Sequence, residues 1–296
     1  MELFQLNRLY IIESLYDKLH TGDILYNALC KEKKAGRFSR FVIEFHDLNN
    51  IDDWNAFVSK VKNDIITNHV YPIIDLEIHG DKGNKGYILK NDDLLQWDKL
   101  FHDFQEINIT CKNYLMLTLG ICRGMNISQF IRINSRSPFL VAVGSFFELL
   151  NTEFLYSFGT FYEEFLETYD LKKAMDNLYN INKVPLETRL KFTSINTVDL
   201  FRNVYIGYLK NECSPEGIDR RRKETYKEFL IKEHKLDNRK IRRWYKNHFK
   251  KLLIKTKNKE YRLSLKSFFM LDKYPENEGR FHLPKDVNDF NKLYLR

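Results

Sequence analysis

The sequence lacks the features of several common classes of protein. Its four cysteines lie far apart in 296 residues, and none forms a Cys-x-x-Cys pair. This spacing argues against a disulfide framework and against a zinc site, so we expect free thiols. The longest apolar runs reach only about half of the roughly 20 residues that a membrane-spanning helix needs. The chain also shows no internal repeat and no low-complexity tract.

The N-terminal residues lack the pattern of a secretory signal. Glu2 and Glu13 interrupt the first apolar stretch, and no small-residue cleavage site follows it. Hydrophobic residues make up 43% of the chain and charged residues 30%, as in a soluble globular protein. We therefore expect a cytoplasmic protein without a membrane partner.

The positive charge is concentrated in one segment. Between Arg220 and Glu260 there are 17 Lys and Arg against 5 Asp and Glu, whereas the rest of the chain has 31 against 35. One interpretation is a pair of amphipathic helices with a solvated basic face and with Tyr226, Phe229, Leu230, Trp244, Phe249 and Leu253 packed inward. The other is a surface that binds a nucleotide messenger, an acidic protein or nucleic acid. The aromatic residues that follow, over 267–281, predict a tail that folds back onto the body of the protein.

Strand-like and helix-like segments alternate over the first two thirds of the chain. The pattern predicts strands over 41–48, 71–80, 114–122 and 138–145, with a short extended piece over 86–90. It predicts helices over 51–66, 91–108, 128–132, 151–168, 170–180 and 198–210. Such alternation indicates an α/β domain with a mostly parallel sheet and helices on both faces. We expect a helical segment over 1–40, the α/β domain over 41–212, and a basic, mainly helical extension over 213–296.

Two of the predicted strands end in reactive side chains. The first ends at His79-Gly80 and the second, one helix later, at Cys122-Arg123-Gly124. A strand–helix–strand crossover makes the two strands parallel, so their carboxyl ends lie at the same edge of the sheet. Ligands of open α/β sheets bind at that edge, and neighbouring strands are about 4.8 Å apart. The thiol and the imidazole can therefore meet.

This pair of side chains suits nucleophilic catalysis. A thiol becomes a good nucleophile when a base favours the thiolate, and histidine can also return the proton to a leaving amine. The backbone amides of Gly80 and Cys122 are candidates for the oxyanion site. Taken singly, each side chain has a plainer interpretation, as a buried structural cysteine and an ordinary strand-end histidine.

The motifs His-Gly and Ile-Cys-Arg-Gly, each closing a strand, resemble those of the caspase-like cysteine peptidases, the group of caspases, metacaspases, gingipain-type and CHAT proteases. The resemblance covers about residues 41–180 and is closest to the bacterial CHAT and caspase-like proteins. It implies a sheet of about six strands, with His79 as general base and acid and Cys122 as nucleophile. It also implies hydrolysis of protein or peptide substrates without a cofactor. For bacterial members it further implies a regulated effector in antiviral defence or cell death, switched by a small molecule or a regulatory protein.

The sequence departs from the caspases beside the nucleophile. Caspases have a glutamine two residues before the cysteine, and this chain has Gly120 there. Cleavage after aspartate is therefore not expected. Asp75, Glu77 and His79 alternate onto one face of their strand. Glu77 can orient the site, receive a basic P1 side chain, or form a salt bridge to a covering helix.

Two further residues flank the predicted dyad. Arg123 either favours the thiolate or caps the loop after Cys122. Asp81 lies in a polar loop after His79, where loops shape substrate entry. These two residues, with Asp75, Glu77 and Gly120, form the predicted substrate pocket. The competing function is a catalytically silent binding module with this fold, whose basic 220–260 segment binds a nucleotide messenger or nucleic acid.

Overall fold

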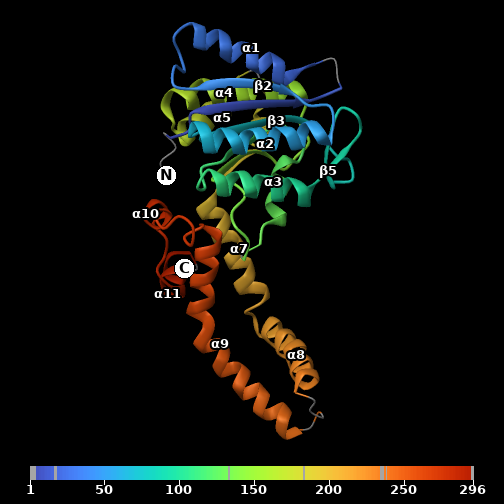
Figure 1. Cartoon of the computed structure of the whole chain (residues 1–296), viewed down its shortest axis with the longest axis vertical. Helices are drawn as coiled ribbons and strands as arrows, with labels where there is room; N and C mark the ends of the chain where they lie inside the picture. The colour runs from blue at the N-terminus through green and yellow to red at the C-terminus, as the bar shows by residue number, and fades with distance from the viewer. Residues whose placement is uncertain are drawn as a thin grey trace. The chain divides into compact units, whose positions relative to one another are not determined.

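The chain forms two compact units (Figure 1). The computed structural model describes residues 5–16, 19–132, 134–182, 184–233, 237 and 239–294, apart from the side chains of 250–257. The first unit consists of Met1–Ile131 and Arg136–Thr197, and the second of Arg132–Ser135 and Val198–Arg296.

A mostly parallel sheet forms the centre of the first unit. Its main path runs β2-β1-β3-β6-β7-β8, in which only the last pair is antiparallel. The hairpin strand β4 pairs with β3, and β5 pairs with β4. The strands are Arg8–Ser14 (β1), Val42–Asp47 (β2), Pro72–Gly80 (β3), Gly86–Ile88 (β4), Leu94–Gln96 (β5), Met116–Leu119 (β6), Val141–Ser145 (β7) and Phe192–Asn196 (β8). The predicted α/β fold with a mostly parallel sheet is confirmed, and the six-stranded path carries two more short strands.

Helices cover both faces of this sheet. On one face, Tyr162 of α4 donates a hydrogen bond of 3.0 Å to Asp75 of β3. On the other, Tyr10 of β1 donates one of 2.8 Å to Asp64 of α2. Helix α1 packs with α4, and α2 packs with α3. The bounds are Thr21–Lys34 (α1), Ile51–Asn68 (α2), Trp97–Thr110 (α3), a 3₁₀ helix at Gly124–Phe130 (η1), Asn151–Thr168 (α4), Leu171–Asn180 (α5) and Leu186–Arg189 (α6).

The local sequence explains where the crossover helix α2 begins and ends. The side chain of Asn50 accepts a hydrogen bond of 2.9 Å from the backbone N–H of Asp53, which satisfies one of the unpaired donors of the first turn. His69 then adopts a left-handed conformation with φ of 51° and ends the helix. After this turn the chain enters β3 at Pro72.

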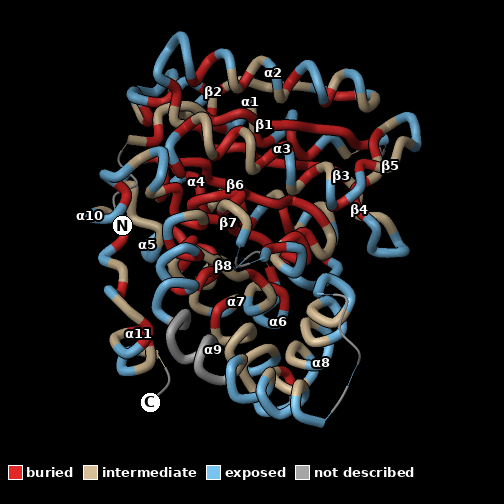
Figure 2. Tube along the Cα trace, turned by 60° about the horizontal axis from the view of Figure 1, so that its bottom comes forward, coloured by how far each residue is buried: buried red, intermediate tan, exposed pale blue. Residues whose placement is uncertain are grey.

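The central strands are buried on both faces, as Figure 2 shows in red. In β3 the first seven residues are buried, and His79 and Gly80 are the first to reach intermediate exposure. All four residues of β6 are buried. When both faces of a strand are covered, only the side chains at its ends are accessible to solvent. A site can therefore open at the end of β3.

The prediction of a helical segment over 1–40 is wrong for its first part. Arg8–Ser14 form β1, which lies between β2 and β3 in the sheet, and the helix α1 begins only at Thr21. A short apolar run does not distinguish strand from helix by its periodicity, and here pairing with two neighbouring strands decides the outcome. The first unit accordingly includes residues before 41, and it ends at Thr197 rather than at 212.

Two other local predictions are corrected. The helix predicted over 91–108 begins at Trp97, because Leu94–Gln96 form β5 against β4. The edge strand β8 has no counterpart among the predicted elements, because its sequence, FTSIN, carries few apolar residues. It pairs antiparallel with β7.

Aromatic side chains hold the second unit together. Its helices are α7 (Thr197–Asn211, whose first residue belongs to the first unit), α8 (Pro215–Lys232), α9 (Arg239–Phe268), α10 (Asn277–Phe281) and α11 (Val287–Tyr294). Phe201 of α7 contacts Phe268 and Phe269, with ring centroids 5.3 and 5.4 Å apart. Phe269 in turn contacts Phe281 of α10 at 5.0 Å. The predicted tail therefore folds back, onto α7 and α9.

The described helices include none that is long and apolar enough to cross a membrane. All four cysteines are described, and no disulfide joins them. In the described part of the chain, no three His, Cys, Asp or Glu side chains are grouped so as to hold a metal ion.

Candidate active site

His79 and Cys122 come from neighbouring parallel strands. His79 is the last residue but one of β3, and Cys122 follows three residues after the end of β6. The pairing of Leu76 with Leu119 aligns the two strands up to the point where β6 ends. Both residues thus lie at the carboxyl edge of the sheet, as the sequence predicts.

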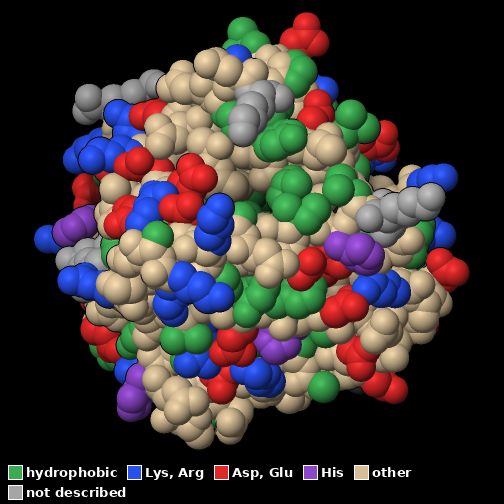
Figure 3. All heavy atoms as spheres, turned by 90° about the horizontal axis from the view of Figure 1, so that it is seen from above, with side chains coloured by type: hydrophobic (Ala, Val, Ile, Leu, Met, Phe, Trp, Pro, Cys, Tyr) green, Lys and Arg blue, Asp and Glu red, His purple; other side chains and the backbone are tan. Residues whose placement is uncertain are grey.

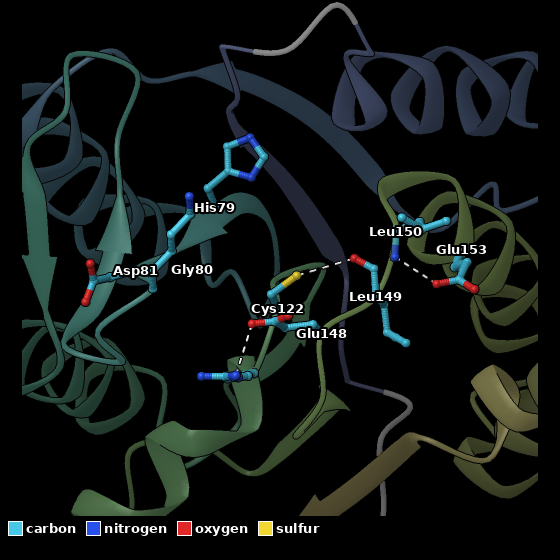
Figure 4. A pocket seen from close by; sticks show the side chains of 10 residues that line it. His79, Gly80, Asp81, Cys122, Glu148, Leu149, Leu150 and Glu153 are labelled. Carbon is cyan, nitrogen blue, oxygen red and sulfur yellow. Dashed lines mark hydrogen bonds and ion pairs between the residues drawn. The ribbon is translucent and has the colours of Figure 1, made fainter.

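The two side chains line one cavity of about 390 Å³ (Figure 4). The wall comes from the end of β3 and its following loop, from the loop after β6, and from the loop that leads into α4. The lining residues are His79, Gly80, Asp81, Lys82, Cys122, Arg123, Glu148, Leu149, Leu150 and Glu153. Cys122 and His79 are both half-buried, so neither is closed off from the cavity.

The backbone between the two residues is closely packed. A Cβ atom on Gly80 would lie 2.6 Å from the carbonyl oxygen of Cys122, so only glycine fits at this position. The pairing of β3 with β4, in which Gly80 faces Tyr87, fixes this strand end. The described chain has no acceptor for the backbone N–H of Cys122, whereas Arg123 N–H donates to Phe147 O at 3.0 Å. The N–H of Cys122, one of the two predicted oxyanion donors, is thus available.

The thiol is directed away from the imidazole. Cys122 Sγ donates a hydrogen bond of 3.3 Å to the carbonyl oxygen of Leu149. Figure 4 shows the sulfur pointing at Leu149 and the His79 ring turned to the other side. That ring lies against Tyr16, with centroids 4.7 Å apart. For proton transfer, the thiol has to leave Leu149 and approach the imidazole across the cavity.

The loop over 146–150 is fastened across Cys122 by Arg123. This residue donates its backbone N–H to Phe147 and pairs its guanidinium with Glu148, Nη2 to Oε1, at 3.0 Å. Its φ of 59° is left-handed, which turns the chain sharply after Cys122. Of the two interpretations of Arg123, the structure thus supports a role in holding the loop.

The same loop is anchored at its far end by Glu153. The Glu153 carboxylate accepts the backbone N–H of Leu150 at 2.7 Å and the hydroxyl of Thr188 at 2.8 Å. Arg123 and Glu153 together define a segment, Phe146–Leu150, that we call the thiol loop. Leu149 reaches the thiol through its backbone, so nothing in its side chain could have indicated this contact from the sequence.

Asp75 lies beneath the cavity and does not line it. It is fully buried and accepts hydrogen bonds from the hydroxyls of Thr118 and Tyr162. Burial raises the pKa of Asp75 to about 7, and the two hydroxyl donors lower it only in part. Its position is structural, since it joins β3 to β6 and α4.

Glu77, two residues closer than Asp75 to the carboxyl end of β3, is also buried. Its Oε2 accepts a hydrogen bond of 2.7 Å from Thr21 at the start of α1, and its Oε1 has no hydrogen-bond partner among the described residues. Burial raises the pKa of Glu77 well above its usual range, and the charges of Asp75 and Glu13 raise it further. The salt bridge to a covering helix is not found within the described residues, because α1 offers a hydroxyl instead of a cation.

Gly120 makes room for this carboxyl group. A Cβ atom on Gly120 would overlap the carboxyl group of Glu77. The residue two positions before Cys122 and the residue two positions before His79 are therefore in contact. Of the five predicted pocket residues, Asp81 and Arg123 line the cavity, whereas Asp75, Glu77 and Gly120 lie behind its wall.

Glu13 completes a row of buried carboxyl groups that the motifs do not reveal. It pairs in register with Glu77, and its Oε2 accepts the backbone N–H groups of Gly22 and Asp23 at 2.9 and 3.2 Å. Its Oε1 lies 2.7 Å from His20 Nδ1. The N-terminus of α1 thus partly compensates the acidic row, as helix N-termini do for anions. The only sequence feature that marks Glu13 is an acidic residue near the end of an apolar run.

No family model matches the sequence, and no curated protein matches it.

Proposed function

We propose that the protein is a caspase-like cysteine endopeptidase in which Cys122 is the nucleophile and His79 the general base and acid. The observation that carries this proposal is that the thiol and the imidazole, 43 residues apart in sequence, line one open cavity at the carboxyl edge of two neighbouring strands. A protein or peptide is the substrate, and no cofactor is needed for the chemistry of this pair.

The reaction follows from the roles of the two side chains. His79 takes the proton of Cys122, and the sulfur attacks the carbonyl carbon of the scissile peptide bond. The N–H of Cys122 donates to the oxyanion of the tetrahedral intermediate. His79 then gives the proton to the leaving amine, and water, activated by the same imidazole, hydrolyses the thioester and frees the thiol.

The row of carboxyl groups supports a substrate with a basic P1 residue. The Oε1 atom of Glu77, which has no partner in the described structure, lies behind Gly120 and next to the nucleophile's loop. A Lys or Arg side chain that enters beside Gly120 would give this oxygen its missing partner and favour its ionised form. An aspartate there would leave this oxygen without a cationic partner, so we expect no cleavage after Asp.

The contact between Cys122 and Leu149 supports regulation. A thiol that donates to a backbone carbonyl is not yet poised toward its base, so the site needs a movement of the thiol loop before it can react. A small molecule, a regulatory protein or the substrate itself can supply that movement. A cytoplasmic effector of antiviral defence or cell death is the setting that fits such control.

The test is covalent labelling of the full-length protein. An acyloxymethyl ketone peptide with Lys at P1 is incubated with the wild type, Cys122→Ala, His79→Ala and the control Cys213→Ala, and labelled residues are mapped by mass spectrometry. Labelling of Cys122 in the wild type and the control, and in neither dyad variant, is the expected result. If His79→Ala is labelled as strongly as the wild type, His79 does not activate the thiol and the proposed dyad is wrong.

A catalytically silent binding module is the second candidate. The orientation of the thiol toward Leu149 and of the imidazole toward Tyr16 favours it. It predicts that Cys122 stays unlabelled by the peptide probe even when the thiol loop is loosened, while a small uncharged alkylating agent still modifies the thiol.

A further inference from the structure

The helices α8 and α9 of the second unit carry a dense set of exposed cations. In Figure 1 the two helices lie side by side, and ring contacts between Tyr226 and Tyr245 and between Phe229 and Tyr245, each at 5.1 Å, join them. These aromatic residues occupy the inner stripe of the pair. The exposed cations are Arg220, Lys223, Lys227, Lys232, Arg239, Lys240, Arg242, Arg243, Lys246 and Lys259.

Two of the carboxylates near this surface are already engaged, whereas Glu224 and Glu228 of α8 are exposed. Asp219 pairs with Arg222 and with Lys223, and Asp237 pairs with Arg242. Within the described residues, Lys227, Arg243 and Lys246 have no carboxylate within ion-pair distance. The surface therefore retains net positive charge after its internal pairs are formed. By contrast, the face of the first unit shown in Figure 3 mixes Lys and Arg with Asp and Glu.

An exposed aromatic ring lies among these cations. Trp244 is 54% exposed; one interpretation of the sequence packs it inward, and its ring does contact Phe229 of α8 at 5.9 Å while it stacks on His248 at 5.1 Å. Its neighbours along the helix are Arg243 and Tyr245, of which only Tyr245 belongs to the inner stripe. An indole beside unpaired cations can stack on a base while the cations contact phosphates.

The length of the surface fits an extended polyanion. From Arg239 to Lys259 the helix α9 extends on the order of 30 Å, at 1.5 Å per residue. A nucleic acid offers one phosphate at each nucleotide along such a length, whereas an acidic protein would need carboxylates at matching positions. The exposed Trp244 favours unpaired bases over a duplex, since stacked base pairs hide their faces.

We propose that the α8–α9 surface binds single-stranded nucleic acid through its phosphate backbone, with Trp244 as a stacking platform. This binding is independent of the His79–Cys122 site. RNA and DNA share the backbone chemistry, and the experiment separates them.

The test is fluorescence anisotropy of the full-length protein with labelled 20-nucleotide oligo(U) and oligo(dT), from 50 to 200 mM salt. Because each neutralised phosphate contributes about 0.7 to the salt slope, six contacts give a slope of about −4 for log K against log salt. The triple variant Lys227→Glu, Arg243→Glu, Lys246→Glu is expected to bind at least ten-fold more weakly. Trp244→Ala should weaken binding several-fold and leave the salt slope unchanged.

The matched control reverses three exposed lysines of the first unit, Lys34, Lys172 and Lys173, to Glu. It changes the net charge equally and should bind within two-fold of the wild type. Arg243→Gln with Lys246→Gln, checked by circular dichroism, tests the same surface if the charge reversals disturb the helices. Equal losses in the control and the α8–α9 variant overturn the proposal, as does the absence of binding at 50 mM salt. Tighter binding of a polyglutamate peptide assigns the surface to an acidic protein, and tighter binding of duplex DNA removes the role of Trp244.

Discussion

Gly80 and Cys122 are in backbone contact, so that no side chain fits on Gly80 without displacing the Cys122 carbonyl group. This contact sets the distance between the strand that carries the histidine and the loop that carries the thiol. Packing of backbone on backbone is stiff, because neither side can move a flexible end out of the way. The geometry of the candidate site therefore depends on a residue with no side chain.

Gly80→Ala is expected to reduce labelling of Cys122 by the peptide probe at least ten-fold, because the added Cβ pushes the loop after β6 away from β3. Labelling and the free energy of unfolding are measured together. Gly159→Ala in α4 is the control, since a Cβ there meets nothing within 4 Å and alanine is the better helix former. Unchanged labelling in Gly80→Ala contradicts the importance of this contact.

Glu148→Gln is expected to raise the rate at which Cys122 is alkylated by iodoacetamide, by about two- to five-fold. The substitution removes the ion pair with Arg123, and exposed pairs of this kind contribute up to about 1 kcal/mol. The thiol loop then moves more often, and the hydrogen bond between Cys122 Sγ and Leu149 O is broken more often. The rate is measured from the Cys122 peptide by mass spectrometry, with Glu187→Gln as the control. An equal or slower rate would show that Arg123 and Glu148 do not hold the thiol.

Gly120→Ala is expected to destabilise the protein by about 1–3 kcal/mol, because the new methyl group overlaps the Glu77 carboxyl. In the background of Glu77→Ala, which removes that carboxyl, the same substitution should cost much less. The free energies of unfolding of the two single variants and the double variant are compared in denaturant titrations. Additive effects would mean that the two residues are not in contact.

Asp75→Asn is expected to change how stability depends on pH. The carboxyl has a pKa near 3.9 in the unfolded chain and about 7 in the folded protein. Between these values the unfolded chain is ionised while the folded protein keeps its proton. Unfolding then releases a proton, and the free energy of unfolding falls as pH rises.

The difference in free energy of unfolding between Asp75→Asn and the wild type should thus increase from pH 4 to pH 7 and level off above it. Denaturant titrations at several pH values measure it, and the comparison cancels the other titrating groups. Asp64→Asn serves as a comparison. Burial raises the pKa of Asp64, but hydrogen bonds from Lys60 and Tyr10 outweigh it and lower that pKa. The ionisation of Asp64 therefore changes the free energy of unfolding with pH in the opposite direction. A pH-independent difference for Asp75→Asn would contradict ionisation near neutrality.

Glu77→Gln is expected to reduce cleavage or labelling with Lys or Arg at P1 by at least ten-fold and to leave uncharged P1 residues within two-fold. The raised pKa of Glu77 means that glutamine resembles its neutral form, so the fold should be preserved. A peptide library profiled with the wild type and the variant gives the measurement. If the P1 preference is the same in the variant and the wild type, Glu77 does not determine specificity. The proposed roles of His79 and Cys122 would not be affected by that result.

The α/β order of elements, the placement of His79 and Cys122 where two strands end, and the basic segment could all be predicted from the amino-acid sequence. Apolar periodicity and the parallel crossover are local rules, and these predictions depend on nothing else. The sequence did not determine that residues 8–14 form a strand, because the same apolar run suits a helix until two strands pair with it. The grouping of Glu13, Glu77 and Gly120 behind the cavity, and the contact of Leu149 with the thiol, became visible only in the folded protein. These contacts join segments that are distant along the chain, and the Leu149 contact is made by a backbone atom that every residue possesses.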